Sequence, residues 1–168
     1  KISEPIFINP TTLPFRKKID LNYSISSCEN CGFYQYDLET ENWKYSPTSY
    51  IDNLINTKLS SGGVFAVLKE EIEPKIYNLI PNPNGKYKQK DLKKIKFNLV
   101  DDESGINEKK INIIIDNQIL FYDYIDYRNL AIVELDSILS LGKHSIEILV
   151  YDNVNNLNSI KGEFIIIE

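Results

Sequence analysis

Apolar and polar residues alternate along the second half of the chain, in short runs that are separated by turn-forming residues. In Ile95-Lys96-Phe97-Asn98-Leu99 the apolar side chains all fall on one face, and residues 146–150 show the same period of two. A period of two indicates a strand with one buried face and one wet face. The pattern predicts about seven strands, at residues 75–80, 94–100, 110–116, 119–124, 131–135, 144–151 and 160–167.

Good turn residues separate these runs, at positions 81–85, 116–117 and 141–143. Seven short strands at regular spacing are typical of an immunoglobulin-like β-sandwich. The expected fold class is therefore all-β, with antiparallel sheets and no parallel sheet around a ligand crevice.

The first half, residues 1–70, is also β-rich but less regular. Residues 18–25 alternate, and residues 34–38 and 43–45 flank the polar turn 39–42, which predicts a hairpin. Only residues 52–60 could form a helix, and we interpret them as non-helical. Seventy residues make a marginal independent core, so this half is expected either to be a truncated sandwich or to lean on the second half for stability.

A short charged segment separates the halves. Glu70, Glu71 and Glu73 follow a strongly apolar run at residues 64–68, and Pro74 favours an extended conformation at Glu73. This composition is typical of a linker between two domains. We therefore predict a β-sandwich domain at 1–70, a linker at 71–74 and an immunoglobulin-like domain at 75–168.

Composition narrows the class of protein. The formal net charge of −5 argues against nucleic-acid binding, which needs a basic face. No apolar run approaches the roughly 20 residues that span a bilayer. The chain starts at Lys1 and has no methionine, so it is expected to be a processed chain or an excised piece of a longer one. Its richness in Ile, Asn, Lys and Tyr indicates an AT-rich, bacterial source.

Several motifs resemble bacterial immunoglobulin-like domains. They are the Asp-x-Ser-Gly-Ile turn at 102–106, the Gly142-Lys143-His144 strand start, and the Tyr-Asp-Asn ending at 151–153. That family usually has Asp-x-x-Gly-Asn in the last turn, and here Asn155 replaces the glycine. Asparagine tolerates a positive φ, so the turn can survive the change.

The first half resembles the β-sandwich modules that follow the catalytic domain of some lysostaphin-type cell-wall metallopeptidases, and modules of other surface proteins. The resemblance is carried, in order, by residues 14–19, 32–34, 42–43 and 63–68. It implies an accessory, non-catalytic region whose partner is the upstream domain of the same parent protein. Those peptidases bind zinc through His-x-x-x-Asp and His-x-His, and this chain has a single histidine. Their catalytic centre is therefore not expected here.

Cys28 and Cys31 form the first candidate for chemistry. A Cys-x-x-Cys pair serves redox centres and zinc sites. Zinc needs two more ligands, and the only histidine, His144, lies in the other predicted domain. A thioredoxin-type centre needs a βαβ setting, which the surrounding pattern lacks. The remaining readings are a small-ring disulfide or two free thiols, and an exported chain favours the disulfide.

His144 and a lysine run are the next candidates. No serine–histidine–acid arrangement can be read from the sequence, because Ser145 is merely adjacent to His144 and neighbours on a strand point to opposite faces, so we expect a surface histidine. The lysines could contact anionic wall polymers, but a solvated loop is the default interpretation. They are Lys86, Lys88, Lys90, Lys93, Lys94 and Lys96.

Aromatic residues could instead stack on sugars. Tyr34 and Tyr36 alternate with polar neighbours, as do Trp43 and Tyr45, so core packing on the inner face is the preferred interpretation of that hairpin. A second group stays ambiguous, and it consists of Tyr122, Tyr124 and Tyr127.

The acidic turns carry the most specific hypothesis. In a sandwich of this connectivity, the turn with Asp101, Asp102 and Glu103 emerges at the same pole as Asp152. Carboxylates that converge suit calcium, which takes six to eight oxygen ligands. The alternative is that these aspartates hydrogen-bond their own turns, and we give it more weight. No other metal, cofactor or catalytic residue is predicted.

Taken together, the patterns predict a non-catalytic accessory region of an exported bacterial protein, located in the periplasm, on the cell surface or outside the cell. Its role would be a structural spacer or a support for a partner domain. The alternative is a carbohydrate- or wall-polymer-binding module. An enzyme is the weakest of the three readings, because no nucleophile–base pair, metal-ligand cluster or phosphate loop is present.

Overall fold

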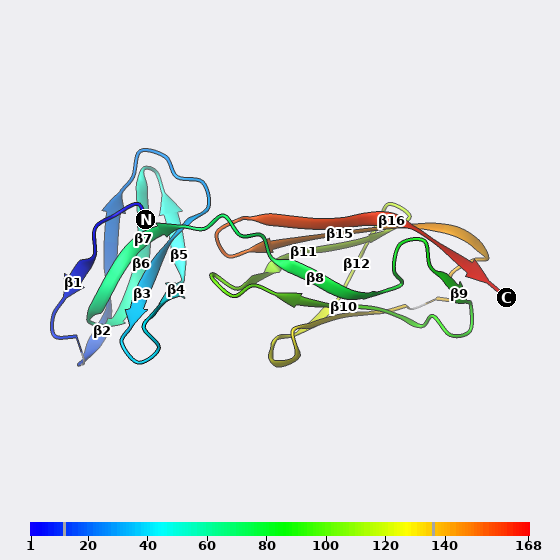
Figure 1. The fold of residues 1–168 in the computed structure, drawn as a ribbon, viewed down its shortest axis with the longest axis horizontal. Helices are drawn as coiled ribbons and strands as arrows, with labels where there is room; N and C mark the ends of the chain where they lie inside the picture. The colour runs from blue at the N-terminus through cyan, green and yellow to red at the C-terminus, as the bar shows by residue number, and fades with distance from the viewer. Residues whose placement is uncertain (12, 136) are drawn as a thin grey trace. The chain divides into compact units, whose positions relative to one another are not determined.

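The computed structural model describes residues 1–11, 13–135 and 137–168. The chain divides into two compact units (Figure 1). The first unit contains Lys1–Ile72 and also takes in two turns, Asp102–Gly105 and Asn153–Asn156. The second unit contains Glu73–Asp101, Ile106–Asp152 and Leu157–Glu168. Each unit is built from two packed sheets, so the prediction of an all-β, sandwich fold is confirmed.

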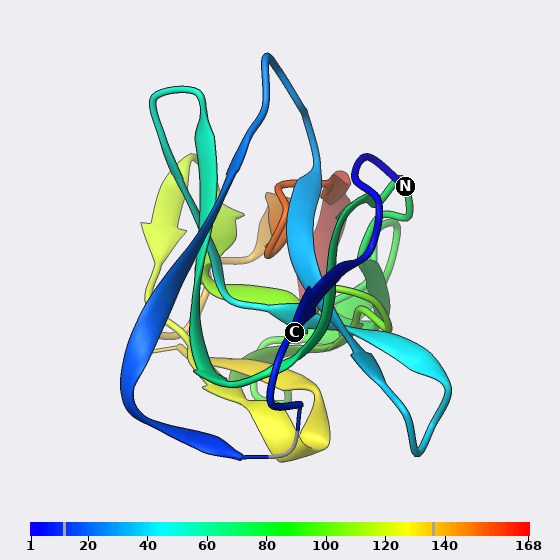
Figure 2. The same ribbon diagram turned by 90° about the vertical axis from the view of Figure 1, so that its left-hand side faces the viewer.

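In the first unit, a four-stranded sheet has the order β1-β7-β3-β4 and a three-stranded sheet has the order β2-β6-β5. Figure 2 looks onto this unit, where β2 in blue lies alongside the hairpin of β5 and β6 in teal. The strands are β1 (Ile6–Ile8), β2 (Pro14–Ser24), β3 (Cys31–Asp37), β4 (Asn42–Ser46), β5 (Thr48–Ile51), β6 (Leu54–Ser61) and β7 (Gly63–Lys69).

The segment that could have been helical is a strand. In β6, Ile55, Thr57 and Leu59 are buried and their neighbours are more exposed, which is the period of two that a half-buried strand requires. The predicted hairpin at 34–45 is present as β3 and β4, and its register places Tyr34 opposite Tyr45 and Tyr36 opposite Trp43.

The predicted facing of that hairpin is wrong. Between the two sheets lie Cys31 and Phe33, which pack against Ile55 and Val67. Because successive strand residues point to opposite faces, Tyr34 and Tyr36 take the other face of the sheet, together with their cross-strand partners. Tyr34 is nevertheless only 3% exposed. The alternation was visible in the sequence, but alternation alone does not say which face is inner.

In the second unit, the sheets have the orders β13-β14-β10-β8 and β12-β11-β15-β16-β9. If β8 and β9 are taken as a first strand that is divided between the sheets, these are the ABED and C′CFG orders of an immunoglobulin sandwich. The strands are β8 (Lys75–Ile80), β9 (Lys86–Lys88), β10 (Lys94–Val100), β11 (Ile106–Ile115), β12 (Gln118–Leu120), β13 (Asp123–Ile125), β14 (Leu130–Glu134), β15 (Gly142–Asp152) and β16 (Leu157–Ile167).

Two details of the second unit correct the sequence analysis. The single strand expected at 119–124 is two strands, β12 in one sheet and β13 in the other, because the chain crosses between the sheets at Phe121 and Tyr122. The lysine run, expected as a solvated loop, contains β9, which pairs in parallel with β16 through the register Lys86↔Ile165 to Lys88↔Ile167.

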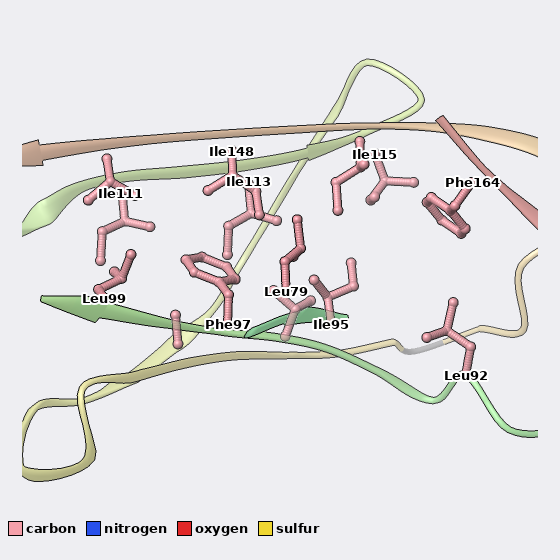
Figure 3. Close-up of a cluster of buried hydrophobic side chains, with 14 of the residues drawn as sticks. Leu79, Leu92, Ile95, Phe97, Leu99, Ile111, Ile113, Ile115, Ile148 and Phe164 are labelled. Carbon is pink, nitrogen blue, oxygen red and sulfur yellow. The ribbon is translucent and has the colours of Figure 1, made fainter. Parts of the chain in front are cut away.

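The core of the second unit lies between its two sheets (Figure 3). Phe97 from one sheet and Ile113, Ile148 and Phe164 from the other are fully buried. Burial of one such side chain contributes about 1.5–3 kcal/mol, so this layer of apolar side chains is the main source of stability in the unit. One short 3-10 turn (Asp126–Arg128) joins β13 to β14. Among the described residues, no helix is long and apolar enough to cross a membrane.

Candidate functional site

Cys28 and Cys31 form a disulfide in the turn before β3. Cys31 is completely buried against Phe33, whereas Cys28 lies at the edge of the same cluster. The bridge therefore closes a four-residue ring at the rim of the core of the first unit. Its environment is that of a structural bridge, and a structural bridge is typical of an oxidising compartment.

His144 is 6% exposed, so the expectation of a surface histidine is wrong. Its ring stacks on Phe164, with 5.6 Å between the ring centroids. Nδ1 lies 2.6 Å from Oδ2 of Asp116, and Nε2 lies 2.8 Å from the carbonyl oxygen of Ser140. Carboxylate and carbonyl oxygens only accept hydrogen bonds, so this geometry favours the ring that is protonated on both nitrogens.

The electrostatics of this pair agree with the geometry. Burial alone would lower the pKa of His144, but the bonds to Ser140 and Asp116 outweigh it and hold that pKa above its usual value. Burial alone would raise the pKa of Asp116, but the bonds from His144 and Ser145 hold it below its usual value. The pair closes the β11–β12 turn onto β15 and is structural.

The two acidic turns converge as the connectivity predicts. One carboxylate oxygen of Asp101 and one of Asp152 lie within 4.8 Å of each other, and Asp152 is fully buried. Asn153 donates from its side chain to the carbonyls of Ser104 and Gly105, at 2.9 and 3.1 Å. Asp102 is exposed. Calcium binding at Asp101, Asp102 and Asp152 stays a prediction. In the second turn, Asn155 replaces the usual glycine and has the positive φ, +77°, that this position requires.

The tyrosines do not form one exposed platform. Tyr34 packs edge-on against Tyr45 and donates a hydrogen bond of 3.0 Å to Oε2 of Glu70. Burial, followed by the charge of Glu70, raises the pKa of Tyr34 far above its usual value. Tyr122 is half-buried and donates to the carbonyl of Glu108, whereas Tyr127 is 81% exposed.

A polar groove of about 570 Å³ lies in the first unit, where the chain crosses from β4 to β5 at Pro47. Its apolar lining residues are the buried Leu59 and Phe65, the half-buried Tyr45 and the exposed Pro47. The remaining lining side chains are polar or cationic, and they include Gln35, Ser46, Asn56, Ser60, Lys18 and Lys58. None of the described residues that line this groove is an aspartate or a glutamate.

Sequence reasoning missed this groove. Its residues come from six strands, β2 to β7, which belong to both sheets of the unit, so no single local run of the sequence marks it. The only available signal is the row of polar residues Asn56, Lys58 and Ser60, which marks one wet face of β6 without showing that it borders a hollow.

The comparisons with known proteins find distant similarities to solved structures alone. No protein-family model matches the chain, and no curated protein matches it. Among solved structures, CopC from Methylosinus trichosporium OB3b matches 55% of this chain and 92% of its own, with 12% identity and a TM-score of 0.45. Dimeric latent PorU from Porphyromonas gingivalis matches 90% of this chain and 20% of its own, with 11% identity and a TM-score of 0.42. These similarities are too distant to assign a function.

Proposed function

We propose that this chain is a non-catalytic accessory region of an exported bacterial protein and that it acts as a structural spacer or support for a partner domain. The disulfide at Cys28 and Cys31 supports the exported setting. The observation that carries the spacer role is the parallel pairing of β9, near the start of the second unit, with β16, its last strand.

That pairing determines how the second unit responds to tension. In a parallel pair, the preceding chain and the following chain leave at opposite ends, so pulling on both makes the strands slide past each other. All the connecting hydrogen bonds then bear the load together, whereas a hairpin that is pulled from one end opens bond by bond. Three backbone bonds flank or join the pair, from Asn84 to Glu163, from Ile165 to Gly85 and from Gln89 to Ile167, at 2.6, 2.9 and 2.8 Å.

Single-molecule stretching of the full chain tests this role. Gln89 follows Lys88 in a turn in which the N–H of Asp91 donates to the carbonyl of Lys88, so residue 89 holds the second position of that turn, which favours proline. Gln89→Pro removes the N–H that bonds Ile167 and should lower the unfolding force of the second unit. The increase in contour length shows which of the two units has unfolded.

Gln89→Ala is the matched control. It removes the side-chain bond from Gln89 to the carbonyl of Leu139 but keeps the backbone N–H. The alanine variant should therefore unfold near the wild-type force. Unfolding of the wild-type second unit without a resolvable force peak would refute the spacer role.

A carbohydrate- or wall-polymer-binding module is the second candidate function. The polar groove of the first unit favours it, because the groove combines the apolar surfaces of Tyr45 and Pro47 with hydroxyl and amide groups. The tyrosines and the lysine run, which first indicated such a role, are in part buried or built into a strand.

A further inference from the structure

The polar groove has the two surfaces that a sugar ring requires. A pyranose presents C–H groups on its faces and hydroxyls around its edge, so it needs an apolar floor and a polar rim. Leu59 and Phe65 are 3% and 1% exposed and lie beneath the groove, so its accessible apolar surface is that of the half-buried Tyr45 and the exposed Pro47. Ser46, Ser60 and Ser61 supply hydroxyls at the rim.

These rim groups are available to a ligand. Among the described residues, no side-chain hydrogen bond engages the hydroxyls of Ser46, Ser60 and Ser61. By contrast, Thr48 and Asn56 already form hydrogen bonds within the unit. The hydroxyl of Thr48 accepts from the N–H of Phe33, and the side-chain amide of Asn56 donates to that of Asn22. Gly63 leaves space for the amide of Gln35, since a Cβ there would lie 2.7 Å from its Nε2. The groove thus holds both committed structural groups and uncommitted donors and acceptors.

The groove is open because two strands, β4 and β6, have an unpaired edge beside it. β4 is the edge strand of its sheet, and β5 pairs with β6 only between Leu54 and Thr57. One edge of β6 from Lys58 to Ser61 therefore has no neighbouring strand within the described sheet. A linear ligand can lie along this edge and continue beyond the groove.

The charge of the groove is positive. Lys18 and Lys58 line it, and Lys58 also forms a solvent-exposed ion pair of 3.1 Å with Asp20, which lies outside the lining. The register of β2 against β6 shifts between Pro14 and Ile19, and this irregularity contains Arg16, Lys17 and Lys18. Bulges re-aim side chains, and of these three cations Lys18 lines the groove.

We propose that this groove binds a linear glycan or polyol polymer that carries carboxylate or phosphate groups. The inference rests on the binding alternative above and is independent of the spacer role, because neither Lys18 nor Lys58 belongs to the β9–β16 pair. Hydroxyl and amide side chains meet the ring hydroxyls, Tyr45 and Pro47 meet a ring face, and the lysines meet the acidic groups.

NMR titration of the full chain tests the proposal with four probes. They are a tetramer of galacturonic acid, a neutral galactose tetramer, a glycerol phosphate oligomer and inorganic phosphate. We expect amide shifts at Ser46, Ser60 and Ser61 with one of the two anionic polymers, and the one that binds identifies the source of the charge. The neutral tetramer and inorganic phosphate should bind at least tenfold more weakly, on the order expected for loss of charge-assisted contacts.

Paired variants separate the groove from the overall charge of the protein. Lys18→Gln with Lys58→Gln should weaken binding by about tenfold. Lys86→Gln with Lys88→Gln makes the same change of charge on β9 and should leave binding unchanged. Absence of groove shifts with both anionic polymers, equal binding of the neutral tetramer or of phosphate, or equal loss in both double variants would each overturn the proposal. The stretching experiment is unaffected by any of these outcomes.

Discussion

The Nδ1 atom of His144 lies 2.6 Å from Oδ2 of Asp116, which joins the start of β15 to the turn between β11 and β12. The other ring nitrogen lies 2.8 Å from the carbonyl oxygen of Ser140, so acceptors on both sides favour the protonated imidazole. Since His144 is the only histidine in the chain, its titration can be followed without assignment of other rings.

We predict that the second unit becomes less stable as the pH rises above neutrality. The pKa of His144 is raised in the folded state, so its contribution is complete below the unfolded value of about 6.5 and is lost as the pH rises through the folded pKa. Urea unfolding between pH 5 and 9 should show this loss. In His144→Gln the slope should disappear from that window, and an NMR pKa of His144 below 6.5 would contradict the prediction.

Asp116 limits the same stabilisation on the acid side. Its pKa is lowered in the folded state, so its contribution is present above the unfolded value of about 3.9 and is lost as the pH falls through the folded pKa. Asp116→Asn should bring the pKa of His144 down toward its usual value. Because Asp116 is about half exposed, we expect this variant to cost no more than about 1 kcal/mol at pH 6.

Loss of the disulfide should lower the free energy of unfolding less than the introduction of a polar group at the buried Cys31. A four-residue ring removes little chain entropy, and by that account its reduction costs about 2 kcal/mol at most. Cys28→Ser should cost a similar amount in urea unfolding. Cys31→Ser should cost at least about 1 kcal/mol more, because it also places a hydroxyl in the apolar core. Equal costs would contradict this assignment.

Removal of the Tyr34 hydroxyl should destabilise the first unit. Tyr34 donates to Glu70, which is 1% exposed, so Tyr34→Phe deprives a buried carboxylate of one donor. We expect a loss of about 1–3 kcal/mol in the free energy of unfolding. Tyr36→Phe is the matched control on the same strand, and its effect should stay within about 0.5 kcal/mol.

The calcium hypothesis can be tested by thermal melting. Asp101 and Asp152 approach each other, but the bonds that Asn153 makes to Ser104 and Gly105 support the interpretation that these turns are held by their own hydrogen bonds. That interpretation predicts the same melting temperature in calcium and in chelator. A calcium-dependent rise would instead support a bound cation, since a ligand of the folded state stabilises it by mass action.

The sequence predicted elements well where one local signal decided them. The bounds of β8 and β10 match the expected strands because alternation and flanking turns agree there. The sequence did not predict the features that depend on contacts with a segment distant in the chain. β9 is a strand only because β16 offers it an edge, and His144 is buried only because Ser140 and Asp116 satisfy its two nitrogens.

The same limit explains the candidate site. The inner face of β3 is set by contacts of Phe33 with Ile55 on another sheet, which periodicity cannot reveal. The polar groove depends on β5 being shorter than β6, and a difference in strand length of this kind has no distinct sequence pattern. The acidic turns were brought together correctly because sandwich connectivity alone fixes the pole at which they emerge.

The position of Lys86 and Lys88 on β9 has a consequence for association between copies of the protein. β9 is an edge strand of the five-stranded sheet, and a bare edge of this kind invites another chain to add a strand. Lysine side chains make such an addition costly, because the incoming strand would have to desolvate them. The lysines therefore disfavour aggregation through this edge. Replacing Lys86 and Lys88 with valine would turn this edge into a template for fibrous assembly.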